Sequence, residues 1–171
     1  MGEGALAEAG PYLQEALITF DHFDHPAKCW LATQAHADLG GVALLQGDLD
    51  AAQQHLGRSL SSATGNRSLD ASRFALPFVA RLLAQQGQTE RAVEIYALAS
   101  RYPYVANSRW YQDLVGQYME SVGASLPPEV REAAQARGRA RDLSATAEEL
   151  ATTLNLDISE TVASRSDQLS P

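Results

Sequence analysis

Cysteine is almost absent from this sequence, since Cys29 is the only one among 171 residues. An intrachain disulfide and a cysteine-rich metal framework are therefore excluded, and a reducing compartment is the expected setting. Long apolar runs are also missing: no window approaches the roughly 20 apolar residues that a membrane-spanning helix requires. The first residues contain neither a basic stretch nor the apolar run of a signal peptide. These absences favour a soluble, cytoplasmic protein that does not associate with a membrane.

Positive charge is also in short supply. The chain has 13 Lys and Arg residues against 21 Asp and Glu residues, for a formal net charge of −8. This excess disfavours non-specific attraction to nucleic acid or to an anionic membrane surface. We therefore expect no direct nucleic-acid binding, although a local basic patch stays compatible with the composition.

Sequence motifs of catalysis are lacking as well. There is no Gly-rich phosphate-binding loop followed by Lys, no Gly-x-Ser-x-Gly elbow and no paired-cysteine motif. Cys29 follows Pro26 and has no evident base or oxyanion donor, so a small buried residue is the favoured interpretation. The segment Asp21–His25 holds two His and two Asp residues, but a polar helix end fits it better than a metal site. We predict no enzymatic activity, no cofactor and no metal.

Strand-forming patterns are scarce, whereas good helix formers are abundant. Ile and Val are few, no alternation of period two persists, and residues 75–86 and 129–140 consist largely of helix formers. Pro77 lies inside an apolar stretch and predicts a kink or a late helix start. The pattern predicts an all-α fold with about eight helices.

One pattern occurs three times along the chain. Each copy begins with Gly, has Ala five positions later, and has a large residue four positions after that; the three glycines lie 43 and 40 residues apart. The copies are Gly4, Ala9 and Leu13; Gly47, Ala52 and Leu56; and Gly87, Ala92 and Tyr96.

This pattern has a direct physical interpretation. The glycine suits a tight turn between two helices, where a positive φ is expected. Asp48 and Thr89 are predicted to cap the helices that follow. Ala52 and Ala92 allow two helix backbones to approach closely, and the large residue four positions on fills the space beside that contact.

The remaining segments complete a series of helices. Capping and apolar spacing predict helices over residues 35–45, 74–83, 107–121, 129–137 and 147–154, the last with a capping box from Thr146 and Glu149. The basic run Arg137, Arg139 and Arg141 is interpreted as a solvated turn. Residues 155–171 are polar and keep no apolar face, so we predict a disordered C-terminal tail there.

Residues 39–56 carry a family resemblance. Leu39-Gly40, followed by Gly47, Ala52 and Leu56, resembles the tetratricopeptide repeat, although His36 stands where that repeat has Trp. The period of 40 to 43 residues exceeds the usual period of about 34 and is similar to that of the repeats in bacterial STAND-type signalling ATPases and transcription regulators. The resemblance implies a right-handed α-solenoid of antiparallel helix pairs over residues 1–154. Because the first copy supplies only the second helix of a pair, we expect a fragment of a longer protein.

The resemblance also implies a binding surface on the concave face, which the first helices of the pairs would line. The aromatic stretch after residue 101 is interpreted mainly as helix packing, with a binding surface as the alternative, for which Tyr104 and Tyr111 are the more exposed candidates. The candidate binding residues are Gln34, Ala37, Gly41, Leu44, Phe74, Arg81, Gln85, Tyr104 and Tyr111.

Two functions follow as hypotheses. The first is a protein-interaction or ligand-sensing module, the C-terminal sensor part of a larger STAND-type signalling protein with an NTPase domain in the same chain. The second is a free-standing adaptor that binds peptides. Either would take a protein or peptide partner, or a small-molecule effector.

Overall fold

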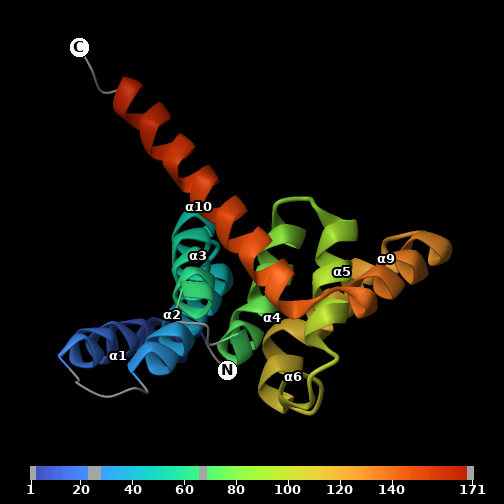
Figure 1. The fold of residues 1–171 in the computed structure, drawn as a ribbon, viewed down its shortest axis with the longest axis horizontal. Helices are drawn as coiled ribbons and strands as arrows, with labels where there is room; N and C mark the ends of the chain where they lie inside the picture. The colour runs from blue at the N-terminus through green and yellow to red at the C-terminus, as the bar shows by residue number, and fades with distance from the viewer. Residues whose placement is uncertain (1–2, 23–27, 66–68, 169–171) are drawn as a thin grey trace.

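The computed structural model describes residues 3–22, 28–65 and 69–168, and this part of the chain is helical with no strand (Figure 1). The prediction of an all-α protein is thereby confirmed. No helix in these ranges is both long enough and apolar enough to cross a membrane. The elements are α1 (Glu3–Asp21), α2 (Lys28–Gln46), α3 (Leu49–Gly65), α4 (Leu69–Gln85), α5 (Thr89–Ala99), α6 (Pro103–Ala106), α7 (Arg109–Tyr111), the π-helical turn η1 (Gln112–Gly116), α8 (Gln117–Ala124), α9 (Pro128–Ala140) and α10 (Leu143–Gln168).

Two tight turns join α2 to α3 and α4 to α5. Gly47 and Gly87 adopt φ values of 79° and 80°, as predicted for the turn glycines. The Asp48 carboxylate accepts a hydrogen bond of 2.9 Å from the N–H of Ala51, so its predicted capping role is confirmed. The predicted cap at Thr89 is wrong, because α5 begins at Thr89 and no side chain caps it.

The small residues of the repeated pattern lie where helices meet. Ala52, Leu56 and Ala92 are fully buried. A Cβ atom on Gly40 of α2 would come within 2.6 Å of the Leu56 side chain of α3. The close approach of α2 and α3 therefore depends on Gly40 and on the small side chain of Ala52.

Replacing Ala52 by Leu is expected to lower the free energy of unfolding by about 1–3 kcal/mol, because the added atoms have no free volume between α2 and α3. Urea denaturation followed by circular dichroism measures the change. Gln54→Leu is the matched control, since Gln54 lies on the exposed side of the same helix. Equal stability of the two variants would contradict the assigned packing.

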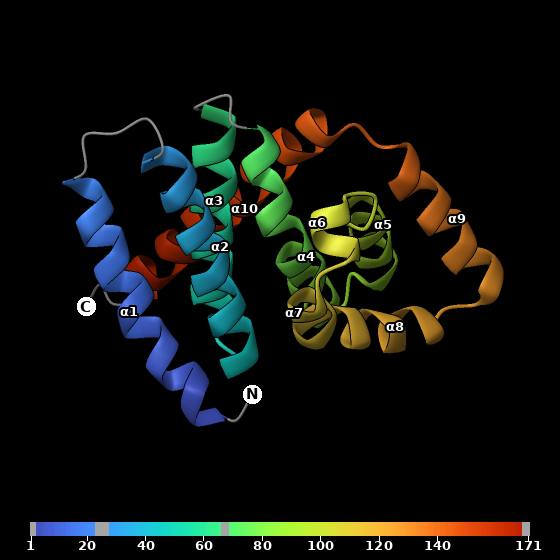
Figure 2. The ribbon, with the colours of Figure 1, turned by 90° about the horizontal axis from the view of Figure 1, so that it is seen from below.

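The first copy of the pattern behaves differently from the other two. Gly4 lies inside α1 instead of in a turn, and α1 includes Pro11. α1 packs against α2, as Figure 2 shows. The prediction of a turn at Gly4 is therefore wrong, because the helix begins before this glycine.

The C-terminal segment also differs from the prediction. α10 begins at Leu143, where the Asp142 carboxylate accepts a hydrogen bond of 2.9 Å from the N–H of Ala145, so the cap is Asp142 and not Thr146. α10 then packs against α3 and buries Leu150 and Leu154 (Figure 1). The predicted disordered tail, 155–171, is wrong over most of its length because the helix continues to Gln168; residues 169–171 lie outside the described residues.

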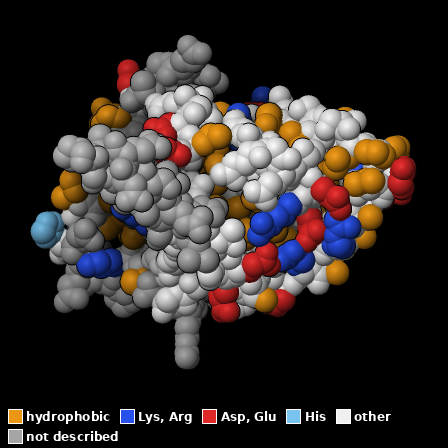
Figure 3. Space-filling model, turned by 90° about the horizontal axis from the view of Figure 1, so that it is seen from above, with side chains coloured by type: hydrophobic (Ala, Val, Ile, Leu, Met, Phe, Trp, Pro, Cys, Tyr) orange, Lys and Arg blue, Asp and Glu red, His pale blue; other side chains and the backbone are white. Residues whose placement is uncertain are grey.

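Salt bridges join α5, α9 and α10. Glu94 of α5 accepts a hydrogen bond of 2.8 Å from Nε of Arg137 and another from Arg141, which also pairs with Glu149 of α10. Burial raises the pKa of Glu94, but the two arginines outweigh this effect and leave the pKa below its usual value. The predicted solvated turn is thus corrected for Arg137 and Arg141. In Figure 3, acidic and basic side chains lie intermixed on the side of α5 and α9.

Candidate binding groove

Two adjoining cavities lie against α1, α2, α4 and the segment from α6 to η1; Figure 2 shows α2 between α1 and α4, with α6 and α7 beside α4. Their volumes are about 340 Å³ and about 460 Å³. Asp38 and Trp110 line both cavities, which therefore meet at these two side chains; together we call them the aromatic groove. The other lining residues are Ala9, Tyr12, Leu13, Gln34, Gly41, Val42, Leu45, Phe78, Pro103, Tyr104, Asn107, Ser108 and Leu114.

A series of aromatic ring contacts lies beside the groove, and three of its members, Phe78, Tyr104 and Trp110, line it. Consecutive ring centroids lie 4.8 to 5.8 Å apart, mostly edge to face, which is the favoured geometry for aromatic pairs. The series comes from α2, α4, α6 and α7. Its members are Trp30, Phe74, Phe78, Tyr104, Trp110 and Tyr111.

Part of this aromatic surface remains exposed. Tyr104 is 49% exposed and Trp110 is 38% exposed, while Tyr12 on α1 is 73% exposed. Side chains of this kind dominate the binding energy of protein interfaces because they bury a large area at small conformational cost. The groove therefore offers anchoring positions for a ligand.

Among the residues that the structure describes, Asp38 is the only charged one that lines the groove. No hydrogen bond or ion pair reaches its carboxyl group from the described residues. Burial raises the pKa of Asp38 to about 6. Burial, followed by the charge of Asp38, also raises the pKa of Tyr104. A carboxylate thus lies among aromatic rings without a protein partner.

The nine predicted binding residues separate into three groups. Gln34, Gly41 and Tyr104 line the groove. Four others are buried in the hydrophobic interior: Ala37, Leu44, Phe74 and Tyr111. Ala37 and Leu44 are corrected because α2 packs against α1, α3 and α4, and Phe74 is corrected because α4 packs against α2, α3 and α5. The last two, Arg81 and Gln85, lie outside the groove.

Tyr111 and Arg81 have structural contacts that explain their positions. The Tyr111 hydroxyl donates a hydrogen bond of 3.2 Å to the carbonyl of Phe74, and only 2% of the residue is exposed, so the expectation of an exposed Tyr111 is wrong. The Arg81 guanidinium donates to the carbonyl of Leu114 and lies 4.7 Å from the ring centroid of Tyr118. Both side chains therefore fasten α4 to the segment that follows α5.

Sequence reasoning missed Asp38, Phe78 and Trp110 as groove residues. Asp38 offered a usable signal, because it is the only acidic residue between Lys28 and Gln46. Trp110 lies in the aromatic stretch that was interpreted mainly as packing. Its place opposite Asp38 depends on the path of α6 and α7, which no local pattern specifies.

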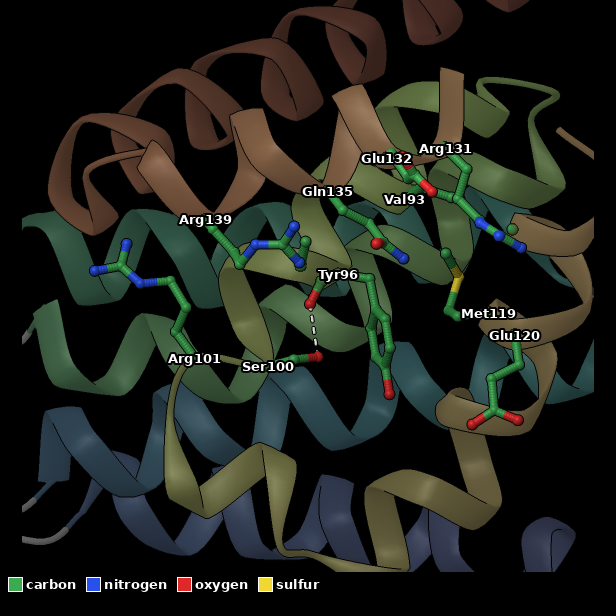
Figure 4. A pocket seen from close by; sticks show the side chains of 12 residues that line it. Val93, Tyr96, Ser100, Arg101, Met119, Glu120, Arg131, Glu132, Gln135 and Arg139 are labelled. Atoms are coloured by element: carbon green, nitrogen blue, oxygen red, sulfur yellow. Dashed lines mark hydrogen bonds between the residues drawn. The ribbon is translucent and has the colours of Figure 1, made fainter. Parts of the chain in front are cut away.

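A further cavity, of about 720 Å³ and separate from the aromatic groove, lies between α5, α8 and α9 (Figure 4). We call it the α5–α9 cavity. Tyr96, a predicted structural position of the repeat, reaches its wall, where the Ser100 hydroxyl donates to the Tyr96 carbonyl at 2.8 Å. Three arginines line the cavity together with Glu120 and Glu132, so charges of both signs are mixed. The mixture gives this cavity no clear preference for anions or cations.

Histidines and acids do not form a metal centre in the described residues. His36 and His55 approach each other with 3.1 Å between their Nδ1 atoms, and burial, followed by the charge of Arg58, lowers the pKa of His55. No group of three or more His, Cys, Asp or Glu residues in the described ranges could hold a metal ion. Residues 23–25, the larger part of the segment Asp21–His25, lie outside those ranges.

Comparison with family models, curated proteins and solved structures finds no match to this chain. The resemblance to the tetratricopeptide repeat therefore stays a prediction.

Proposed function

We propose that this chain is a non-catalytic binding module, of helical-repeat type similar to the tetratricopeptide repeat, that docks a segment of a partner protein in the aromatic groove. The observation that carries the proposal is the groove itself, where exposed aromatic side chains from α1, α6 and α7 surround two adjoining cavities. Concave, mostly apolar sites with a few polar groups are the usual form of ligand sites.

The order of helix contacts supports the repeat interpretation. α2 packs on α3 and on α4, α3 packs on α4, and α4 packs on α5. Each of the two tight turns between paired helices contains one glycine of positive φ. In a solenoid of this type, the first helices of successive pairs line one face, and α2, α4 and the α7–η1 segment all contribute to the groove.

We further propose that the module is the sensor part of a larger STAND-type signalling protein, with the free-standing adaptor as the alternative. The mass of the native polypeptide separates these contexts. An antibody raised against this segment would detect a band several times heavier than 18.4 kDa in the first case and near 18.4 kDa in the second.

Peptides selected from a random display library against this chain are expected to bind in the aromatic groove. Replacing Trp110 or Tyr104 by Ser should weaken their binding at least about tenfold, because each change removes an exposed aromatic anchor. Isothermal titration calorimetry with individual selected peptides measures the effect, and thermal melts check that each variant folds.

Arg131→Ala serves as the control, since Arg131 lines the α5–α9 cavity and not the aromatic groove. It should leave the affinity unchanged. Peptides that lose affinity with this variant and keep it with both groove variants would place the binding site between α5, α8 and α9. A library that yields no binder would also contradict the proposal.

A further inference from the structure

The point where the two cavities of the groove meet has an unusual combination of groups. Asp38 presents a carboxylate there, and Tyr104 and Trp110 present aromatic rings. Aromatic ring faces attract cations, as do carboxylates, so both kinds of group favour the same ligand charge. The other described residues that line the groove, from α1, α2, α4 and the segment from α6 to η1, include no Lys, Arg, His, Asp or Glu.

The side chain that occupies this point must compensate Asp38. A neutral apolar side chain would remove the remaining water from the carboxylate without replacing its hydrogen bonds, which costs free energy. An acidic side chain would add like-charge repulsion. A lysine or arginine would supply both the opposite charge and the hydrogen-bond donors that the described residues do not provide.

We propose that the aromatic groove recognises a lysine or arginine side chain of the partner segment, which pairs with Asp38 between the rings of Tyr104 and Trp110. This inference rests on the proposed function and names the chemistry of its ligand. The net charge of −8 adds a long-range attraction for a basic segment. Val42, Leu45 and Leu114 line the adjoining cavity, so an apolar residue next to the basic one completes the recognised segment.

The electrostatic state of Asp38 fits this role. Its pKa of about 6 leaves it mainly ionised at pH 7.5, and a bound cation would lower the pKa further. The described aromatic groups that neighbour it include no Lys, Arg, His, Asp or Glu: they are Tyr12 from α1, Phe78 from α4, Tyr104 from α6, and Trp110 and Tyr111 from α7. Binding of the basic segment is therefore expected to weaken as the pH falls below 6.

Four synthetic peptides test the proposal: acetyl-Ala-Leu-Xaa-Leu-Ala-amide, with Lys, Arg, norleucine or Glu at Xaa. Each is titrated into the full chain at pH 7.5 while NMR follows the indole N–H signal of Trp110, assigned with a Trp110→Phe variant. The Lys and Arg peptides are expected to shift this signal and to bind at least about tenfold more tightly than the norleucine peptide. Asp38→Asn should abolish that difference.

Asp113→Asn is the matched control, because Asp113 is an exposed aspartate outside the groove that pairs with Arg109. It should retain the preference for Lys and Arg. Equal binding of the Lys and norleucine peptides would overturn the cationic anchor and leave groove docking intact. A preference for Glu, or no shift with any peptide, would overturn the anchor, while the display selection still decides the proposed function.

A fifth ligand tests whether the groove binds a protein segment or a small organic cation. n-Butylammonium carries the same charge as a lysine side chain without its flanking residues. It is expected to bind at least about tenfold more weakly than the Lys peptide, since it leaves the apolar cavity empty. Equal affinity would show that the site serves a small ammonium compound and would overturn the peptide as its occupant.

Discussion

Replacing Gly138 by Ala is expected to lower the free energy of unfolding by about 2–4 kcal/mol, the largest effect we expect from a single methyl group in this chain. A Cβ atom at this position of α9 would lie 2.0 Å from the carbonyl oxygen of Glu94 and 2.9 Å from the Cβ of Ala97. Both atoms belong to α5, and a backbone oxygen cannot move aside as a flexible side chain can. The two helices would therefore have to separate.

The separation would also weaken the ion pairs that join these helices. Arg137 and Arg141, on either side of Gly138, both pair with Glu94. Because Glu94 is 9% exposed, loss of its partners would leave a poorly solvated carboxylate. Urea denaturation at pH 7 measures the total effect.

Gly123→Ala is the control for this experiment. A Cβ atom on Gly123 of α8 would meet the Arg131 side chain at 3.5 Å and the Val93 side chain at 3.9 Å, which are ordinary contacts. This variant should match the parent or exceed it by up to about 1 kcal/mol, because Ala favours helix more than Gly does. A Gly138→Ala variant as stable as the parent would show that α9 does not pack on α5 as described.

Asp38→Asn is expected to stabilise the fold at pH 7 by about 1–3 kcal/mol, while it removes the proposed charge anchor. Burial raises the pKa of Asp38 from 3.8 to about 6, so the folded chain holds this proton more tightly than the unfolded chain does. The stability contributed by this group is fully present below about pH 4 and is lost as the pH rises through 6. Above that pH, the folded state carries an uncompensated carboxylate.

The pH dependence supplies the measurement. The stability difference between Asp38→Asn and the parent should be largest at pH 7.5 and should shrink as urea denaturation is repeated down to pH 5. Asp113→Asn, an exposed and ion-paired control, should stay within about 0.5 kcal/mol of the parent with no such trend. A destabilised Asp38→Asn variant would mean that the carboxylate has a favourable partner in the folded chain.

These two positions illustrate different relations between stability and function. Gly138 serves the fold, since its missing side chain allows α5 and α9 to touch. Asp38 lowers the free energy of unfolding at neutral pH, and no described residue compensates the charge of its carboxylate. Groups that oppose stability without a structural benefit are characteristic of binding sites.

Local patterns in the sequence predicted most of the helices and two of their turns. Helix-forming composition predicted the all-α fold, and the spacing of Gly47 and Gly87 predicted turns with positive φ. The same spacing failed at Gly4, where α1 begins earlier and the glycine has no turn to make. Polar composition likewise misassigned residues 155–168, because a polar helix and a disordered tail share the same residue types.

The sequence by itself determined which segments are helical and which residues are small enough for helices to meet, because these properties depend on neighbours within a few positions along the chain. Only the tertiary structure decided that Asp38 of α2 and Trp110 of α7 line the same groove, and that Ala37 and Leu44 are buried instead of exposed. These outcomes depend on how α1, α4 and α7 pack around α2. That packing is the sum of many contacts between distant segments, and no single sequence motif encodes it.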